Sequence, residues 1–458
     1  MIACPGCGAN LRFDIASQKM HCDYCGGFYD PYVFDNMEKD AEKQKVYDTY
    51  VYLCPQCGAE LTTTDKTDAT SFCPYCGGAS LLFDKISQEN RPDYIIPFRR
   101  TKEDCKKAYL AAARKEILTS SRYKKKELVD SFRGIYMPFW SYRVEQKGEA
   151  GVPALGDSHH ENGYTVYESY TLRANMETSY LGFTHDASRA FEDEISECIV
   201  PYHLRDRKPF NPAYLSGFYA DVADEKEGEY AWDAEEACSE ETKLRLKADP
   251  RIKQALSDAK IRSTELFGSY DIPTASAESK RVFYPVWFMS YRDRDQITYA
   301  TVNGQTGKVV ADFPVSPWRF LAGALLIAAL LFVVFNFLLT LKPGFALALT
   351  SILLIVGMIC AGKRYAKLAE RRAAEKDPER MIRLNKFQTA AKILTGISCA
   401  IAFLVIIFDP VYNIIFYTLC LLQAALLFLT IYKTFRCQLE LARRRPPQFN
   451  KKGGDDRA

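Results

Sequence analysis

Eight cysteines near the start of the chain have a spacing suited to metal binding. They form four Cys-x-x-Cys pairs, which combine into two similar units: Cys4, Cys7, Cys22 and Cys25, then Cys54, Cys57, Cys73 and Cys76. A Cys-x-x-Cys pair makes a tight turn that presents two thiolates to one ion. Two such turns complete the four-sulfur tetrahedral shell that zinc favours. The spacing therefore predicts two Zn²⁺ ions, one in each of two zinc ribbons.

A closed four-sulfur shell leaves no position for water or substrate, so both sites are expected to be structural. Glycines that follow the second cysteine of a pair, such as Gly26 and Gly58, suit a turn with positive φ. Two alternatives stay open: an iron-sulfur site and a thioredoxin-type redox pair. His21, beside Cys22, could replace a sulfur, although a solvated histidine is the simpler interpretation.

The charge of the ribbon region bears on its partner. The whole chain has 458 residues and a net charge of +3, which is not that of a polycation. Residues 1–100 contain ten Lys/Arg and fourteen Asp/Glu, and each zinc with four thiolates adds two negative charges. Phosphate neutralisation supplies most non-specific DNA affinity, so the charge favours a protein partner over nucleic acid. Ribbon aromatic residues could form a contact surface or fill a small core: Tyr24, Phe28, Tyr29, Phe72 and Tyr75.

The C-terminal part of the chain contains four apolar segments, at about 320–341, 345–362, 390–408 and 411–432. About 20 such residues suffice to span a bilayer as a helix. Residues 363–392 hold ten Lys/Arg against four Asp/Glu, and residues 433–458 hold eight against three. The positive-inside rule therefore predicts a multi-pass protein of the cell membrane with both termini in the cytoplasm. The chain also starts without the pattern of a secretory signal, which agrees with a cytoplasmic N-terminus.

Few polar residues interrupt these apolar segments. Asp, Glu, Arg and His are missing from the middle of the spans, which disfavours a pump or transporter. Asn336 and Gln423 are expected to form hydrogen bonds between helices.

The region between the ribbons and the membrane segments alternates strand and helix patterns. Residues 94–98 read as a strand, and residues 102–119 as a helix with Cys105, Tyr109 and Ala112 on one face. An aromatic sequence motif at 135–143 recurs at 284–292, which suggests two related β units. The Asn-Gly and Thr-Gly steps within 297–310 predict a hairpin rather than a phosphate-binding loop. An acidic helical stretch is expected at 224–256.

These patterns together predict a multidomain protein: two small β zinc ribbons, an α+β cytoplasmic domain and an all-α four-helix transmembrane domain. The expected boundaries are ribbon 1 at 1–34, a helical linker at 35–50, ribbon 2 at 51–86, the α+β domain at 87–317, the transmembrane helices at 318–432 and a basic cytoplasmic tail at 433–458.

No catalytic constellation is recognisable in the sequence, and the protein is expected not to be an enzyme. His159 and His160 are neighbours in a loop-like segment and are expected to be solvated. Cys105, Cys198 and Cys238 lack a nucleophile motif, so they are expected to be small buried residues.

In several sequence segments the chain resembles bacterial membrane proteins that carry transcription-factor-IIB-type zinc ribbons. The resemblance covers most of the chain and rests on the two CPxC ribbons, the terminal membrane helices and the segments 95–98, 136–140, 212–218, 284–287 and 302–308. Such proteins are often labelled primosomal-helicase-like, but this chain contains no Walker loop. The resemblance implies an integral membrane protein of Gram-positive bacteria without an established activity. Relatives can have fewer ribbons and spans, and some accompany flotillin-like or phage-shock-protein-A-like proteins.

The sequence therefore favours a non-enzymatic adaptor, anchored in the lipid bilayer, that recruits cytoplasmic proteins. One alternative is a membrane-tethered nucleic-acid-binding or regulatory protein. Another is a small-ligand receptor or enzyme built in the α+β domain.

Overall fold

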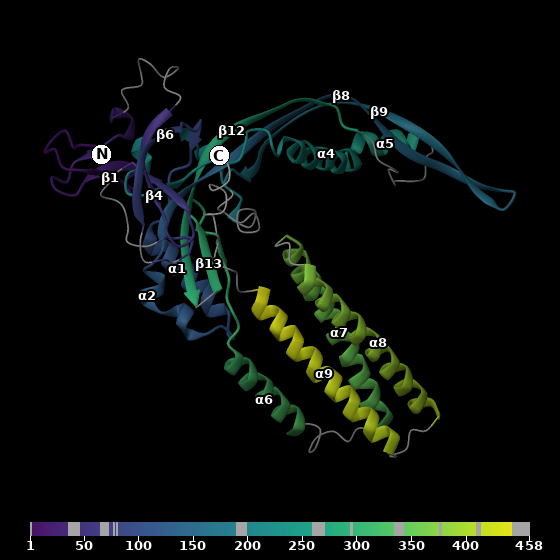
Figure 1. The fold of residues 1–458 in the computed structure, drawn as a ribbon. Coiled ribbons are helices and arrows are strands. Elements are labelled where there is room, and N and C mark those ends of the chain that lie inside the picture. Colours follow the sequence, from purple (N-terminus) through teal and green to yellow (C-terminus); the bar gives the residue numbers. More distant parts are fainter. Residues whose placement is uncertain are drawn as a thin grey trace, which may run out of the picture.

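A small sheet, a large mixed sheet and a group of long apolar helices follow one another along the chain (Figure 1). The structure is a computed structural model, and it describes residues 2–34, 46–64, 73–76, 78, 81–188, 199–258, 271–293, 296–333, 343–374, 378–408 and 414–441.

Ribbon 1 is the small sheet. Its three antiparallel strands are β1 (Leu11–Asp14), β2 (Lys19–Cys22) and β3 (Phe28–Tyr29), followed by the 3-10 turn η1 (Pro31–Phe34). Alternation in β1 and β2 turns Leu11, Phe13 and Met20 inward, where all three are buried. These side chains belong to a core cluster that also contains Phe98 and Tyr214 of the main domain.

The large sheet contains eleven strands and includes ribbon 2. Its main order is β10-β7-β12-β8-β11-β5-β4-β6, while β9 pairs with β8, and β13 joins β12 to β14. The strands are β4 (Val46–Leu53), β5 (Glu60–Thr63), β6 (Leu82–Asn90), β7 (Tyr94–Ile95), β8 (Arg133–Glu161), β9 (Tyr164–Asp186), β10 (Lys208–Pro209), β11 (Tyr219–Asp221), β12 (Thr274–Asp293), β13 (Gln296–Asn303) and β14 (Val309–Ala311).

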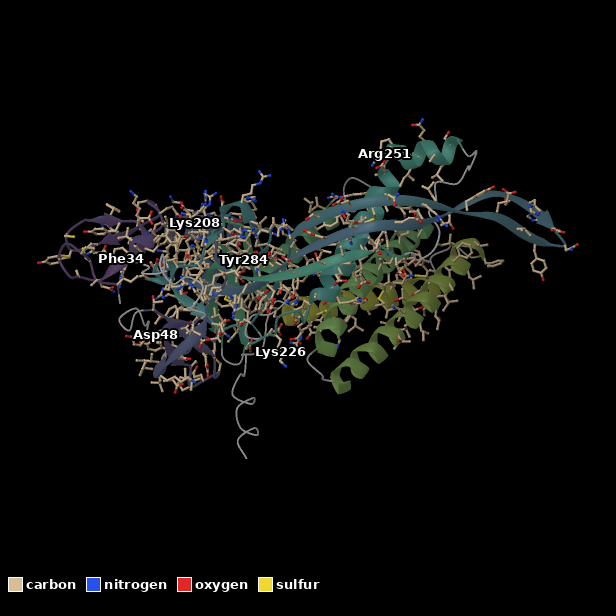
Figure 2. The ribbon with its side chains drawn as sticks, turned by 90° about the horizontal axis from the view of Figure 1, so that it is seen from above. Phe34, Asp48, Lys208, Lys226, Arg251 and Tyr284 are labelled. Atoms are coloured by element: carbon tan, nitrogen blue, oxygen red, sulfur yellow. The ribbon has the colours of Figure 1, made fainter. Side chains whose placement is uncertain are left out.

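The two copies of the aromatic motif lie at the centre of this sheet. Strands β8 and β12 are antiparallel neighbours, and Met137 pairs with Tyr284. The ring of Phe139 stacks on that of Tyr284 with 4.7 Å between centroids. Figure 2 shows Tyr284 in the densely packed middle of the domain. The two motifs therefore pair with each other and form one core. Aromatic cross-strand pairs of this kind stabilise a sheet.

Helices and 3-10 turns surround the sheet. Helix α1 (Lys102–Lys115) starts at a capping box formed by Thr101 and Asp104, and it buries Cys105, Tyr109 and Ala113. The buried alanine is Ala113 rather than the expected Ala112, and the helix ends four residues before the predicted Thr119. The other elements here are η4 (Ser121–Lys124), α2 (Lys126–Val129), η5 (Leu204–Asp206), η6 (Pro212–Leu215), α4 (Ala231–Ala248) and α5 (Pro250–Asp258).

Strands β8 and β9 form a long hairpin that extends beyond the rest of the sheet, with α4 and α5 beside it (Figure 1). The hairpin contains the predicted aromatic strands around 164–170 and 176–183. Buried Gln146 on β8 accepts a hydrogen bond of 2.6 Å from Thr242 on α4 and donates one of 3.1 Å to Ser239. These bonds fix the acidic helix against the hairpin. The hairpin predicted within 297–310 is confirmed as β13 and β14.

The described residues after the sheet domain form four long helices: α6 (Pro317–Val333), α7 (Pro343–Ala374), α8 (Pro378–Phe408) and α9 (Ile414–Leu441). Three segments are long and apolar enough to cross a membrane, namely Gly344–Ala366, Thr389–Phe408 and Ile414–Cys437. Helix α6 is described over 17 residues, and the remainder of the first predicted span, including Asn336, lies outside the described residues. The prediction of a fourth span thus stays a prediction.

The predicted bond from Gln423 between helices is confirmed. Gln423 on α9 accepts a hydrogen bond of 2.6 Å from Thr350 on α7 and donates one of 2.8 Å to Ser351. The three polar side chains satisfy one another within the helix group.

Two expectations about the ribbon region need correction. Residues 46–50, expected at the end of a helical linker, belong to strand β4, while 35–45 lie outside the described residues. Burial alternates from Val46 to Val51, with Tyr47, Thr49 and Val51 buried and the residues between them less so, which suits a strand. Ribbon 2 is also no separate module, because β5 pairs with β11 and β4 with β6 in the large sheet.

Candidate metal centres

The first centre lies between the two cysteine turns of ribbon 1. The sulfurs of Cys4, Cys7, Cys22 and Cys25 all lie within 4.8 Å of one another. The Sγ–Sγ distance is 3.5 Å both for Cys4 with Cys25 and for Cys7 with Cys22. A disulfide requires about 2.05 Å, so these four residues are free thiols brought to a common point.

The second centre is built in the same way inside the large sheet. Its four sulfurs, from Cys54, Cys57, Cys73 and Cys76, also lie within 4.8 Å of one another. The Sγ–Sγ distances are 3.5 Å for Cys54 with Cys76 and 3.8 Å for Cys57 with Cys73.

Backbone hydrogen bonds shape each cysteine turn. The N–H of Cys4 donates to the carbonyl of Ala9 (2.7 Å), and the N–H of Gly8 donates to the carbonyl of Cys4 (2.8 Å). The same two bonds recur in the turns that start at Cys22 and Cys54. The glycine after the second cysteine adopts positive φ in all three turns: Gly8 (74°), Gly26 (71°) and Gly58 (75°). Its lack of a Cβ makes this conformation accessible.

Both centres fit a tetrahedral thiolate-bound ion. A Zn–S bond of about 2.3 Å gives an Sγ–Sγ separation of about 3.8 Å in a regular tetrahedron. The separations of 3.5 to 3.8 Å in the two clusters agree with that value. Each cluster could therefore hold one metal ion, and four sulfurs would close its coordination shell.

The two centres differ sharply in their surroundings. In ribbon 1, Cys7 and Cys25 are exposed, whereas in ribbon 2 all four cysteines are at most 1% exposed. The second centre belongs to a core cluster that includes Ile135, Met137 and Tyr284. Metal at this centre would lie wholly within the core, whereas metal at the first would lie between the buried Cys4 and Cys22 and the exposed Cys7 and Cys25.

Ribbon 1 packs against the main domain at several points, and Gln18, for example, donates a hydrogen bond of 2.7 Å to the carbonyl of Phe98. Ser216, just after η6, donates to the carbonyl of Leu11 (2.6 Å) and accepts from the N–H of Phe13 (3.2 Å). The ring of Phe13 also packs on Tyr214, with 5.0 Å between centroids. The turn that contains Tyr24 remains exposed.

Ribbon 2 is joined to the sheet by a buried polar contact. The hydroxyl of Tyr75, between Cys73 and Cys76, donates to a carboxylate oxygen of Asp221 at the end of β11 (2.7 Å). Ser188 donates to the same oxygen, and the N–H of Val222 donates to the other (3.0 Å). Burial nevertheless raises the pKa of Asp221 to about 6, because the hydrogen bonds offset only part of the desolvation of the charge.

The sequence did not single out Asp221, because acidic residues follow it closely, at 224, 225, 227 and 229, and such a run is typical of a solvated face. Its position after the apolar Tyr219 and Ala220 was the available signal, since a polar residue that ends a buried strand is often enclosed too.

Some aromatic residues of the ribbons offer a contact surface, and others fill the core. Tyr24 is 83% exposed and Phe28 is 52% exposed, so both offer contact surface. Tyr75 is buried, Tyr29 is partly buried, and Phe72 lies outside the described residues.

The other candidate residues lie away from the two centres. His21 pairs with Asp23 at 3.1 Å instead of joining the sulfurs. His159 and His160 are exposed near the tip of the β8–β9 hairpin. Burial raises the pKa of Cys105 and of Cys238, which agrees with unreactive buried thiols. Cys198 lies outside the described residues.

Comparison with known proteins gives one informative similarity. The chain is 29% identical over 333 residues to YdjG, an uncharacterised protein of Bacillus subtilis, and the match covers 68% of this chain and 89% of YdjG. No family model and no solved structure matches.

Proposed function

We propose that the protein is a non-enzymatic adaptor that is anchored in the bacterial cell membrane and recruits cytoplasmic proteins through ribbon 1. In this proposal both cysteine clusters hold structural Zn²⁺. The observation that carries it is the contrast between the ribbons. All four cysteines of ribbon 2 are buried in the domain core, whereas ribbon 1 packs on the core with one part and presents Tyr24 and Phe28 to solvent with another.

The composition of this surface favours a protein partner. Exposed aromatic residues are enriched where proteins bind each other, because they bury a large area at a low cost in side-chain entropy. Asp23 and Asp30 flank the aromatic residues, and a zinc tetrathiolate adds negative charge. Such a surface suits a partner with a basic or mixed rim and repels the nucleic-acid backbone.

Backbone and side-chain hydrogen bonds link the sheet domain to the first of the long helices. Arg319, in the first turn of α6, donates a hydrogen bond of 2.7 Å to the carbonyl of Thr119, and Thr119 bridges to Val315. A rigid link of this kind would hold the sheet domain and its ribbon at a fixed place near the bilayer.

The helix arrangement supports a common side for both ends of the chain. Phe320, where the chain leaves the sheet domain, stacks on Phe435 near the end of α9, with 4.6 Å between ring centroids. The start of α6 thus lies next to the end of α9. The basic loops adjoin this side, and by the positive-inside rule they support the proposal that it faces the cytoplasm.

Affinity purification from crosslinked native membranes tests the adaptor function. The full chain is compared with the double variant Cys7→Ser/Cys25→Ser, which disrupts ribbon 1, and flotillin-like and phage-shock-protein-A-like proteins are the first candidates to seek. We expect specific partners to be lost from the variant while it remains in the membrane fraction. An unchanged set of partners would overturn the proposal.

A further inference from the structure

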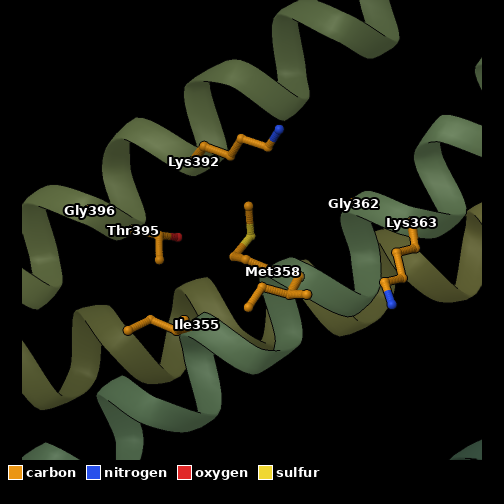
Figure 3. A pocket seen from close by; sticks show the side chains of 8 residues that line it. Ile355, Met358, Gly362, Lys363, Lys392, Thr395 and Gly396 are labelled. Carbon is orange, nitrogen blue, oxygen red and sulfur yellow. The ribbon is translucent and has the colours of Figure 1, made fainter. Parts of the chain in front are cut away.

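A groove of about 430 Å³ lies between α7 and α8 (Figure 3). Its volume is within the range of sites that hold small molecules. The walls are apolar along most of their length, with Ile355, Met358 and Ile359 on α7. Lys363 on α7 and Lys392 on α8 line the groove as well.

Both lysines lie at the same end of the helix pair. Lys363 is three residues before the end of the apolar segment Gly344–Ala366, and Lys392 is three residues after the start of Thr389–Phe408. At 1.5 Å per residue, each Cα is about 5 Å inside its span, which is shallow enough for the ammonium group to reach the membrane interface.

Opposing charge is missing from the neighbouring spans. The segments 344–366, 389–408 and 414–437 contain no Asp or Glu. Two ammonium groups without an acidic residue in these spans favour an anion at the level of the headgroups. Basic pockets between transmembrane helices on the cytoplasmic side bind acidic lipid headgroups in this way.

The apolar wall continues from the lysines toward the bilayer centre. Ile355 is eight residues from Lys363, or about 12 Å along the helix. Ile355 and Ile359 are 45% and 58% exposed, so the wall is open to the surrounding lipid. A site with positive charge at its mouth and apolar surface below matches a molecule with a negative head and a hydrocarbon tail.

We infer that this groove binds one anionic phospholipid of the inner leaflet, with its phosphate at Lys363 and Lys392 and an acyl chain along Ile355, Met358 and Ile359. The inference rests on the membrane insertion in the proposed function, but not on ribbon 1. The bound lipid would join α7 to α8 and make the stability of the helix group depend on lipid composition.

Gly396 provides a way to block the groove without disturbing the fold. It lies on the α8 wall, and a Cβ built there meets no heavy atom within 4 Å. The variant Gly396→Leu should therefore place its side chain in the space of the acyl chain. The variant Lys363→Gln/Lys392→Gln instead removes the charge and leaves the apolar wall intact. Lys433→Gln is the control, because Lys433 on α9 lies four residues before the end of the span Ile414–Cys437 and does not line the groove.

The full chain, extracted from membranes in a neutral detergent, is titrated with phosphatidylglycerol, phosphatidylcholine or inorganic phosphate. Bound lipid is counted by native mass spectrometry, and the melting temperature is recorded. Phosphatidylglycerol should bind with a stoichiometry of one at this site and raise the melting temperature, unlike the other two. Loss of two lysines should weaken binding roughly 30-fold, since each contributes about 1 kcal/mol near an anionic surface. Gly396→Leu should also abolish the retained lipid, and Lys433→Gln should keep it.

Equal binding of phosphatidylcholine, stabilisation by phosphate alone, or equal loss in Lys433→Gln would each overturn the lipid site. Failure of membrane insertion is distinguishable, because the protein would then be recovered in the soluble fraction before any lipid is added. Loss of the adaptor function would change the partners captured through ribbon 1 and leave the lipid titration unaffected.

Discussion

The hydroxyl of Tyr75 lies 2.7 Å from a carboxylate oxygen of Asp221, and this bond connects a cysteine turn of ribbon 2 to the central sheet. Tyr75 is 1% exposed and Asp221 is 4% exposed. A cysteine turn and a sheet strand therefore share a buried, charge-assisted contact. The contact makes ribbon 2 a structural part of the main domain, which leaves ribbon 1 as the accessible ribbon.

Removal of this hydroxyl should destabilise the main domain. Hydrogen bonds to charged groups contribute about 1.5–3 kcal/mol, and Tyr75→Phe would leave Asp221 with one donor fewer. We expect the free energy of unfolding to fall by about that amount in denaturant titrations of the full chain in detergent. Tyr24→Phe, at the exposed aromatic position of ribbon 1, should change it by less than about 0.5 kcal/mol. Equal effects of the two variants would contradict the structural role of Tyr75.

Asp221 should make stability depend on pH. Its folded pKa of about 6 lies above the ordinary 3.8, because burial disfavours the charge. The folded state then binds the proton more tightly, so stability is highest below about pH 3.8 and the full penalty applies above about pH 6. Two pKa units correspond to roughly 3 kcal/mol in total, of which about 1.5 kcal/mol is lost between pH 5 and 7.5.

Unfolding titrations of wild type and Asp221→Asn across that interval measure the effect. The wild type should lose stability more steeply than the variant as pH rises. Metal content must be followed at each pH, since acid protonates thiolate ligands and releases metal from both proteins. Parallel curves for the two proteins would show that Asp221 does not carry the pH dependence.

Metal loss should occur in two separable stages. Cys7 and Cys25 are exposed, whereas the four sulfurs of ribbon 2 are buried, so a chelator should reach the first centre earlier. Cys7→Ser should lower the zinc content from two equivalents to one and lower the melting temperature only modestly, because Cys7 and Cys25 are exposed and only Cys4 and Cys22 of this centre belong to a core cluster. Cys57→Ser should lower zinc content equally and also destabilise the domain by several kcal/mol, because its sulfur belongs to the core cluster. Metal analysis with circular dichroism distinguishes these outcomes from a simultaneous loss.

The stacking of Phe320 on Phe435 predicts the sidedness of the protein. A reporter that is active only in the cytoplasm should function when fused at either end of the full chain. Thiol labelling of single-cysteine variants from outside intact cells should not reach either end. Activity at only one end would contradict the arrangement of α6 beside α9.

Local patterns were sufficient to predict several elements. Cysteine spacing indicated both sulfur clusters, because adjacent thiols in a tight turn need few other residues. Continuous apolar stretches marked α7, α8 and α9, and the Asn303-Gly304 step marked the hairpin that joins β13 to β14.

Long-range pairing could not be predicted in the same way. The strand β5 reaches β11 across more than 150 residues, and the 29-residue strand β8 spans several polar stretches that looked like loops. Pairing partners at that separation are chosen by burial and register, which a single sequence does not display. Those pairings make ribbon 2 part of the large sheet and bury Asp221, so neither feature could be predicted from the sequence.

The central claim is that ribbon 1 is the docking surface of a membrane-anchored protein. A photo-crosslinking amino acid placed at Tyr24 in native membranes tests it most directly, with the same group at the exposed Tyr164 on β9 as control. The account predicts discrete protein adducts from position 24 that disappear when Cys7 and Cys25 are replaced by serine, and no such adducts from position 164. Adducts that persist without the ribbon 1 cysteines, or that form equally from both positions, would contradict it.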